Sequence, residues 1–557
     1  MNDNEKYKII SNDYADLLVE LEFINNLYRL REIADISYNF VNDKYAVLHV
    51  PTSELSDGSL GNFGYAAIPK CYGLMTYFPN EADNAYTVRR LPEENISGKG
   101  VLIGFVDTGI VYTNPIFRYP DNTSKILAIW DQSIDSDINY PPDYYYGTEY
   151  TKEQIDTALK SDNPLSVVPS TDTIGEGTAM AGIAAGFYND ENNFSGVAIN
   201  AELVVVKLKA AKSNIKQFFG IPDDAICFQE NDIMMGISYL VNLAGRLNRP
   251  IVICLGIGSS QGSHKGEDIM SNYLSEIAGL TGNAIVLAAG NEGSQKHHYF
   301  GEIIPPNYYD DVELTIGAED KNFTMELWGY QPNIITMEIY SPSGELIYNI
   351  GDNFVGQSHM EIYMDSAAIH INNFVSEAYS EEQLILFRFR NILEGTWRFR
   401  IRGARDLVNR FHIWLPIRNF ISEETFLHRS NPYTTVCLPG NSNNTVTATA
   451  YNPVDRTLDY DASNGFTSIN LPKPDIAAPG VNILAPTLEN TFLPFSGTSI
   501  ASAYTAGIAA GLLEWGIVKG FFPNMDGIIV RYIITSTATR DNSLIYPNPN
   551  WGFGIIE

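Results

Sequence analysis

Three polar side chains follow runs of residues that indicate buried strands or the start of a helix. Asp107 ends the apolar run 101–106, and Asn291 follows a second apolar run, 284–289. Such runs, with a polar residue at the carboxyl end, are typical of buried parallel strands. Ser499 opens a helix of small residues, where the dipole and the free N–H groups favour a developing negative charge. Together they offer a carboxylate suited to orienting a base, an amide suited to an oxyanion hole and a hydroxyl nucleophile.

The elements that must position these groups alternate between strands and helices. This alternation predicts an α/β fold, a parallel sheet with helices on both faces and a site at the carboxyl ends of the strands. The strand patterns lie at 101–106, 203–208, 251–256 and 284–289, and the helical patterns at 178–186, 232–244 and 499–513.

The order of these groups resembles the subtilisin-like (S8) serine protease family. The stretches 195–198 and 473–480 also resemble family motifs, and the resemblance covers roughly residues 98–295 and 433–557. It implies a triad with an aspartate, a base and a serine, an oxyanion donor, and a strand whose edge pairs with a bound peptide. The implied catalytic positions are Asp107, Glu176 (at the base position), Ser499 and the oxyanion residue Asn291; the implied substrate-binding residues are Gly256, Ile257 and Gly258.

Position 176 holds glutamate where the family has its catalytic histidine. In the family's triad the imidazole takes the serine proton and returns it to the leaving amine, while the aspartate fixes its tautomer. A carboxylate at 176 faces Asp107 at close range, so we expect the two groups to hold a proton between them. An unactivated serine is a weak nucleophile. The sequence therefore favours a pseudoprotease.

A working site built with glutamate is the alternative. The serine-carboxyl peptidases, a related family, use a Ser-Glu-Asp triad, but their partner aspartate lies four residues after the glutamate, where this chain has Met180. Their oxyanion residue is an aspartate, whereas this chain has Asn291. His264 is the one histidine that follows a core-strand segment, and we expect it to be an ordinary loop residue rather than a relocated base.

Composition limits the classes of partner. The 557 residues are 45% hydrophobic and carry a formal net charge of −30, which argues against unaided binding to nucleic acid or to an anionic membrane. The four cysteines show no disulfide or metal-ligand spacing, so we expect reduced thiols, no metal and no cofactor. The chain starts without a signal-peptide pattern, and no run reaches transmembrane length, so we expect the protein to stay inside the cell.

Two segments lie outside the α/β pattern. Residues 1–95 combine a helical pattern at 14–30 with a strand pattern at 45–50, which indicates an α+β segment at the place of the family's prodomain. We expect this segment to stay attached if Glu176 disables the enzyme, and an active enzyme to cut near residues 75–98. Residues 300–432 show short, regularly spaced strand patterns, with a hairpin turn at 342–344, and predict an inserted β-sandwich of jelly-roll type. The α/β domain then comprises residues 96–299 and 433–557.

This arrangement is similar to the Csp proteases of clostridial spores, which the stretches 126–132, 146–150 and 550–554 also resemble. The resemblance implies that active members cleave the pro-form of a spore-cortex lytic enzyme during germination, and that degenerate members regulate germination or sense its signals. We expect a regulator packaged in the spore, with a peptide or protein partner at its cleft, either a related protease or its cortex-lytic substrate. The alternative is an active serine endopeptidase of Ser-Glu-Asp type that processes a cortex-lytic pro-enzyme.

Overall fold

A computed structural model describes residues 3–22, 35–55, 63–77, 85–92, 96–136, 139–350 and 359–557. At its centre lies an eight-stranded sheet whose strands are, in spatial order, β25 (Ile476–Pro479), β24 (Val446–Tyr451), β12 (Asn283–Ala288), β10 (Ile251–Leu255), β5 (Leu102–Asp107), β8 (Glu202–Lys207), β6 (Ile126–Asp131) and β7 (Thr148–Thr151). Neighbouring strands are parallel except for β6 and β7 at one edge. The four strands predicted from apolar runs are β5, β8, β10 and β12, which are adjacent in the middle of this sheet.

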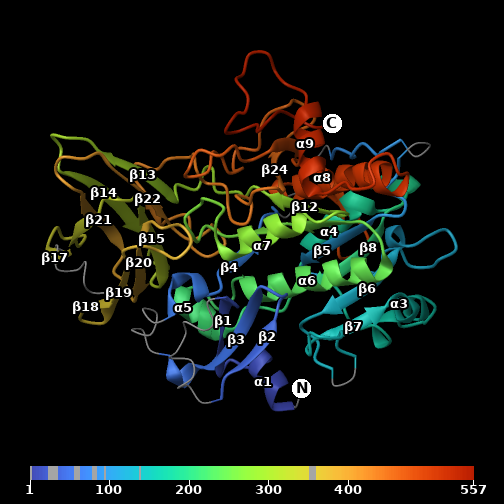
Figure 1. The fold of residues 1–557 in the computed structure, drawn as a ribbon, viewed down its shortest axis with the longest axis horizontal. Helices are drawn as coiled ribbons and strands as arrows, with labels where there is room; N and C mark the ends of the chain where they lie inside the picture. Colours follow the sequence, from blue (N-terminus) through green and yellow to red (C-terminus); the bar gives the residue numbers. More distant parts are fainter. Residues whose placement is uncertain are drawn as a thin grey trace.

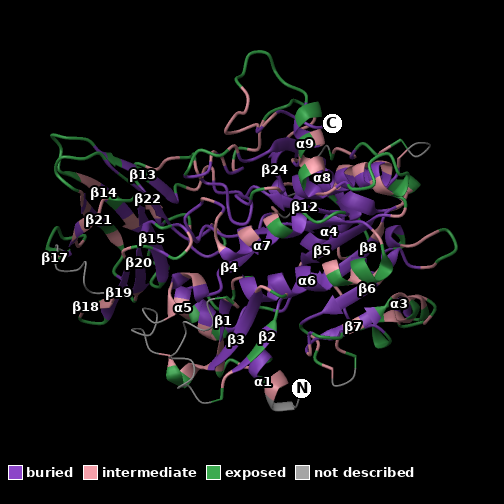
Figure 2. Ribbon diagram, viewed as in Figure 1, coloured by how far each residue is buried: buried purple, intermediate pink, exposed green. Residues whose placement is uncertain are grey.

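Five helices cover the faces of the sheet: α4 (Glu176–Ala185), α6 (Glu230–Leu247), α7 (Ile269–Ala278), α8 (Thr498–Leu513) and α9 (Gly527–Thr537). Successive side chains of a strand point to opposite faces. In β5, Ile103 and Phe105 therefore pack in one core with α4, α8 and α9, and Leu102 and Val106 pack in another with α6 and α7. Helices flank the sheet in Figure 1, and Figure 2 shows its strands buried while the end of α6 is exposed. The predicted α/β fold class is confirmed.

Helix α8 is long enough and apolar enough, together with the turn that follows it, to span a membrane by length and composition alone. The expectation that no segment reaches such a length is therefore wrong for Thr498–Val518. Its apolar character has another explanation, because 78% of its most apolar window is buried inside the protein. The helix packs on β10, β12 and β24, which is the position of a core helix in an α/β unit.

The amino-terminal part contains a helix and a three-stranded antiparallel sheet: α1 (Asp3–Ile10), with β1 (Tyr14–Glu20), β3 (Tyr45–Pro51) and β2 (Ser37–Phe40) in spatial order. The strand predicted at 45–50 is confirmed as β3. The helix predicted at 14–30 is wrong over residues 14–20, because these residues pair one for one with β3 and strand pairing overrides a local pattern. Residues 23–30 of that prediction lie outside the described residues.

Asp16 of β1 joins this small sheet to the α/β unit. Its buried carboxylate accepts hydrogen bonds from Lys212 Nζ at 2.6 Å and from Gln229 Nε2 at 2.8 Å, and it lies 2.7 Å from Nδ1 of His49. Burial alone raises the pKa of Asp16, but Lys212 and His49 outweigh it and hold that pKa well below its usual value. The amino-terminal part is therefore docked through a charged, buried pair.

Two antiparallel sheets form a sandwich between β12 and β24 in the chain. The first sheet consists of β13 (His298–Ile303), β22 (Asn409–Trp414), β15 (Phe323–Gly329), β20 (Gln383–Arg390), β19 (Ala367–Phe374) and β18 (His359–Met364), and the second of β17 (Leu346–Ile350), β16 (Thr336–Tyr340), β21 (Gly395–Arg402), β14 (Tyr309–Ile316) and β23 (Phe426–Leu427). Their facing side chains form one apolar core, in which the rings of Phe387 and Phe399 lie 5.8 Å apart. Figure 1 places the sandwich at one end of the molecule. The turn predicted at 342–344 joins β16 to β17, while the domain limits at 300 and 432 stay a prediction.

A small antiparallel sheet links the amino-terminal part to the α/β unit. Its central strand is β4 (Cys71–Leu74), which lies between β9 (Phe228–Gln229) and β11 (Ile257–Gly258). The described residues also form α3 (Lys152–Leu159), α5 (Ser213–Phe219) and the hairpin of β26 (Ile483–Pro486) and β27 (Phe492–Phe495).

Candidate active site

The carboxyl ends of β5 and β12 meet the first turns of α4 and α8 at one edge of the central sheet. Asp107 is the last residue of β5, and the next residue, Thr108, accepts a hydrogen bond at its Oγ1 from the N–H of Gly177 in α4, at 2.9 Å. The N–H of Gly290, just after β12, donates to Thr498 Oγ1 of α8 at 3.0 Å. These contacts bring the predicted aspartate, asparagine and serine to the same edge.

Glu176 is the first residue of α4 and is wholly buried. The turn before it is held by Asp172, whose carboxylate accepts hydrogen bonds from the N–H groups of Gly175 at 2.9 Å and Thr178 at 3.0 Å. Gly175 has a φ of 112°, in the left-handed region that favours glycine. The Asp172 hydrogen bonds and Gly175 thus hold Glu176 in the first turn of α4, at the carboxyl edge of the central sheet.

Ser499 is the second residue of α8 and is also buried. Gly497, which precedes the helix, has a φ of 128°. A Cβ atom at Gly497 would lie 2.4 Å from the carbonyl oxygen of Met75, so both the backbone conformation and the close approach of another segment require glycine.

The amide of Asn291 bridges the start of α8 and that same carbonyl oxygen. Thr498 orients the amide, because its hydroxyl donates to Asn291 Oδ1 at 3.1 Å. Nδ2 of Asn291 then donates to the oxygen of Met75 at 2.9 Å, and the N–H of Ser499 donates to it at 3.3 Å. An amide and a helix N–H that converge on one oxygen form the arrangement of an oxyanion hole.

The cleft is filled by residues 71–77 of the chain itself, which we call the cleft segment. Its strand β4 pairs antiparallel with β11, so that Leu74 lies opposite Ile257 and Gly73 opposite Gly258. This is how an extended peptide adds to a sheet edge. Two of the residues predicted to bind substrate therefore pair with the protein's own amino-terminal part.

Beyond β4, the cleft segment continues past Ser499. The N–H of Tyr77 donates to the carbonyl oxygen of Ser496 at 2.8 Å. Gly256, the third predicted substrate-binding residue, lies beneath the serine, and a Cβ atom there would come within 2.9 Å of Ser499 Cβ. A larger residue at 256 would therefore crowd the nucleophile.

The Met75–Thr76 peptide bond lies directly at Ser499. The carbonyl oxygen of Met75 accepts a hydrogen bond from Ser499 Oγ at 3.0 Å, in addition to those from Asn291 and the Ser499 N–H. Thr76 Oγ1 also contacts Ser499 Oγ. The Met75 carbonyl occupies the oxyanion hole, so Met75–Thr76 is the bond that a competent serine would attack.

Glu176 binds the cleft segment and makes no hydrogen bond to Asp107. Its Oε1 accepts hydrogen bonds from Thr76 Oγ1 at 3.0 Å and from the N–H of Met75 at 3.3 Å. Oε2 of Glu176 and Oδ2 of Asp107 have no hydrogen-bond partner among the described residues. The structure shows no hydrogen bond between the two carboxyl groups, and the expectation that they hold a proton between them stays a prediction.

Both carboxyl groups are hard to ionise. Burial raises the pKa of Glu176 well above its usual value, and the charge of Asp107 raises it further, whereas hydrogen bonds from Ser499 and Thr76 act in the opposite direction. Burial likewise raises the pKa of Asp107 to about 7. A raised pKa favours the protonated carboxylic acid, which accepts a proton poorly, so burial works against Glu176 as the base for Ser499.

Comparison with known protein families decides the identity of this arrangement. The subtilase family (peptidase S8) matches residues 98–343 and 428–554, which contain Asp107, Asn291 and Ser499. The chain belongs to the subtilase family. This match covers more than half of the chain and leaves out much of the β-sandwich.

This subtilase is also similar to a solved relative over most of its length. The structure of the Clostridium perfringens CspB protease superposes with a TM-score of 0.74 at 28% sequence identity, covering 83% of this chain and 92% of that one. The likeness therefore includes more than the α/β unit.

Curated relatives match a much shorter part of the subtilase. The Arabidopsis thaliana subtilisin-like proteases SBT3.7 and SBT3.2 are 42% identical over 74 residues and 38% identical over 96 residues. These matches cover 12% and 16% of this chain, and 9% and 12% of the plant proteins. The chain thus spans only about a tenth of the length of the curated relatives in these matches.

None of the eight histidines of this subtilase, all of which are described, forms a hydrogen bond with Ser499. His264 is buried with its ring nitrogens 2.9 Å and 3.0 Å from the carbonyl oxygens of Val436 and Ser260, and its ring stacks on Trp414. Burial lowers the pKa of His264 to about 4. His264 is therefore more deeply buried than an ordinary loop residue, and its ring nitrogens contact backbone carbonyls and not Ser499.

Sequence reasoning missed the occupant of the cleft. Met75 and Thr76 make the hydrogen bonds that define the site, and Asn419 of the sandwich region supports them by donating from Nδ2 to the carbonyl oxygen of Leu74 at 2.8 Å. The short run 72–76 carries no strong local signal.

Other than a hairpin in the sandwich, the described residues hold no cluster of His, Cys, Asp and Glu of the kind that binds metal.

Proposed function

We propose that this subtilase is a pseudoprotease that acts as a regulator or signal sensor in spore germination. The observation that carries the proposal is the state of Glu176 at the base position. It is buried, its pKa is raised, and it is hydrogen-bonded to the cleft segment. A serine beside such a group lacks a general base, and loss of one triad member leaves only weak residual catalysis.

The fold relationship supports the biological setting of the proposal. The similar structure is that of the Clostridium perfringens CspB protease, and the similarity covers 83% of this chain, which is more than the α/β unit alone. We propose that the protein resides inside the spore and binds a peptide or protein partner, either a related protease or its cortex-lytic substrate. The net charge of −30 supports a protein partner over a nucleic acid or an anionic membrane.

One observation favours the alternative, an active endopeptidase of Ser-Glu-Asp type that processes a cortex-lytic pro-enzyme. Asn291 and the Ser499 N–H already hold the Met75 carbonyl as they would hold a substrate. A serine with any working base would then cut between Met75 and Thr76.

The two functions predict different masses for the purified recombinant protein. The pseudoprotease stays intact at 61.9 kDa and is not labelled by a fluorophosphonate. Cleavage between Met75 and Thr76, with labelling at Ser499, would overturn the proposal in favour of the endopeptidase. The Ser499→Ala variant is the matched control, since it loses the hydroxyl and keeps the rest of the cleft.

A further inference from the structure

The β18–β19 hairpin brings three side chains with metal-binding chemistry to one face of the sandwich. His359 and Glu361 are two residues apart on β18, so both point to the same side of the strand, and His370 lies opposite Glu361 on β19. Ile362 and Ile369 point the other way, into the apolar core of the sandwich. The three side chains therefore lie on the outer face of the sheet.

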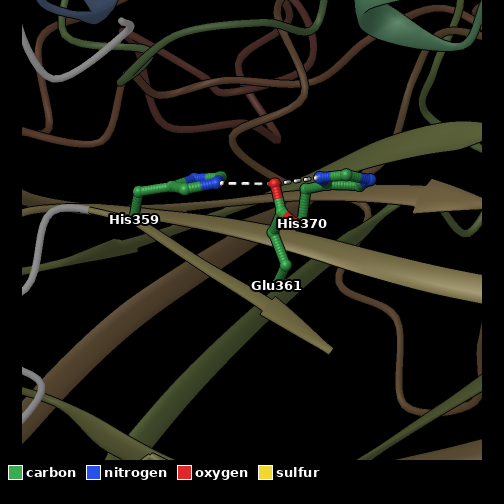
Figure 3. Close-up of side chains that lie close together, drawn as sticks. All are labelled: His359, Glu361 and His370. Carbon is green, nitrogen blue, oxygen red and sulfur yellow. Dashed lines mark hydrogen bonds and ion pairs between the residues drawn. The ribbon is translucent and has the colours of Figure 1, made fainter. Parts of the chain in front are cut away.

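Their nitrogen and oxygen atoms already converge. Figure 3 shows the Glu361 carboxylate between the two imidazoles, with Oε1 at 3.0 Å from His359 Nε2 and at 3.4 Å from His370 Nδ1. Two ligands bound tetrahedrally to Zn²⁺ at about 2.0–2.1 Å lie about 3.3 Å from each other. All three ligand atoms lie within 4.8 Å of one another, so a small rotation of the imidazole rings would bring them to the separation that one metal ion requires.

We propose that His359 Nε2, Glu361 Oε1 and His370 Nδ1 bind a divalent transition-metal ion of the zinc class. Two imidazoles and one carboxylate suit such an ion, whereas Ca²⁺ and Mg²⁺ prefer sets made only of oxygen. Three protein ligands leave a fourth position for water.

The surroundings orient these ligands and leave them reachable. Tyr363 hydroxyl donates to Glu361 Oε2, and the Asn372 amide lies 3.3 Å from His359 Nδ1, so two of the three ligands have a partner on the atom not used for the metal. The three side chains are 13–31% exposed, which gives an ion access from solvent.

A cationic side chain on the neighbouring strand has partners of its own. Arg388 lies opposite His370 on β20, but its guanidinium stacks on Phe218 at 4.6 Å and donates to Asn372 Oδ1 at 3.3 Å. Since β18 is the edge strand of its sheet, a bound ion would link this strand to its neighbour β19.

Zinc titration of the full-length protein tests the proposal. We expect one Zn²⁺ per chain, no uptake of Ca²⁺ or Mg²⁺ at the same concentration, and at least about 100-fold weaker zinc binding in His370→Ala, because even second-shell losses cost 10–100-fold. His428→Ala, which removes an exposed histidine from the same sandwich, should bind as the wild type does. Equal affinity in His370→Ala and wild type would overturn the site.

Cobalt substitution of the wild-type protein gives a second readout that needs no variant. Co²⁺ bound to imidazole and carboxylate gives tetrahedral d–d absorption without a thiolate charge-transfer band. A thiolate band would place the ion at the buried cysteines and overturn the proposal, as would the absence of any binding.

Discussion

Asn291 Nδ2 donates a hydrogen bond to the carbonyl oxygen of Met75 at 2.9 Å, so the oxyanion hole of this subtilase is filled by its own chain. The two residues are 216 positions apart in the sequence, and Ser499 lies beside the bond that follows Met75. The site is therefore complete except for a base, and each missing or retained part can be tested separately.

Glu176→His should restore cleavage. An imidazole at 176 supplies the base, and Asp107 lies ready to orient it, so we expect the chain to split into residues 1–75 and 76–557. An intact triad exceeds one lacking a member by about 10⁴-fold or more. Intact-mass spectrometry measures the products, and Glu176→His with Ser499→Ala is the control that should stay whole. An uncut Glu176→His protein would mean that the defect extends beyond this residue.

In the Glu176→His background, Asn291→Ala should slow this cleavage by about 10²–10³-fold, since one oxyanion-hole donor is lost. Asn419→Ala is the matched comparison, because Asn419 also donates to the cleft segment but at Leu74, one residue before the attacked carbonyl. A neutral hydrogen bond contributes about 1 kcal/mol, so Asn419→Ala should slow cleavage by about tenfold at most. Equal effects of the two changes, followed by gel densitometry over time, would contradict the assigned role of Asn291.

Stability should fall as the pH rises, in part because of the acidic pair. The pKa of Asp107 is raised from 3.8 to about 7, so between these values the folded state binds more protons than the unfolded state. The free energy of unfolding then decreases with rising pH across this window. Glu176→Gln removes a second carboxyl group with a raised pKa and should make the decrease smaller. Urea unfolding at pH 5 and pH 8 measures it, with the exposed Glu394→Gln as control; an unchanged decrease in Glu176→Gln would refute the assignment.

Lys212→Met should destabilise the folded protein strongly. It leaves the buried carboxylate of Asp16 without its closest cation, and breaking a buried pair costs about 3–5 kcal/mol. Arg456→Met breaks the exposed pair with Glu557 and should cost less than about 1 kcal/mol. Denaturant unfolding of both variants gives the comparison, and similar small losses would show that the Asp16 pair does not hold the amino-terminal part in place.

The sequence predicts those parts of the fold that depend on local signals. Asp107 and Asn291 are marked by the apolar strands that precede them, and Ser499 by the helix of small residues that it opens. β1 is different, because its residues follow a helical pattern and become a strand only through pairing with β3. Local periodicity cannot reveal a partner strand that lies farther along the chain.

The contents of the site depend on contacts between distant residues. Met75 reaches Asn291 because β4 pairs with β11, and His359 reaches Glu361 and His370 because of one hairpin register. Neither strand register can be deduced from the spacing of these residues in the sequence. The sequence therefore predicts the catalytic positions but not the peptide that fills the cleft or the histidines that meet on the sandwich.

The cleft segment has a strand partner on each side, β11 on one and β9 on the other. Another peptide could pair with β11 only after β4 had detached from β9 and β11. At high peptide concentration the rate of entry is then set by this internal detachment and no longer by the peptide. The rate of peptide binding along β11 would then depend on the stability of the pairing of β4 with β9 and β11.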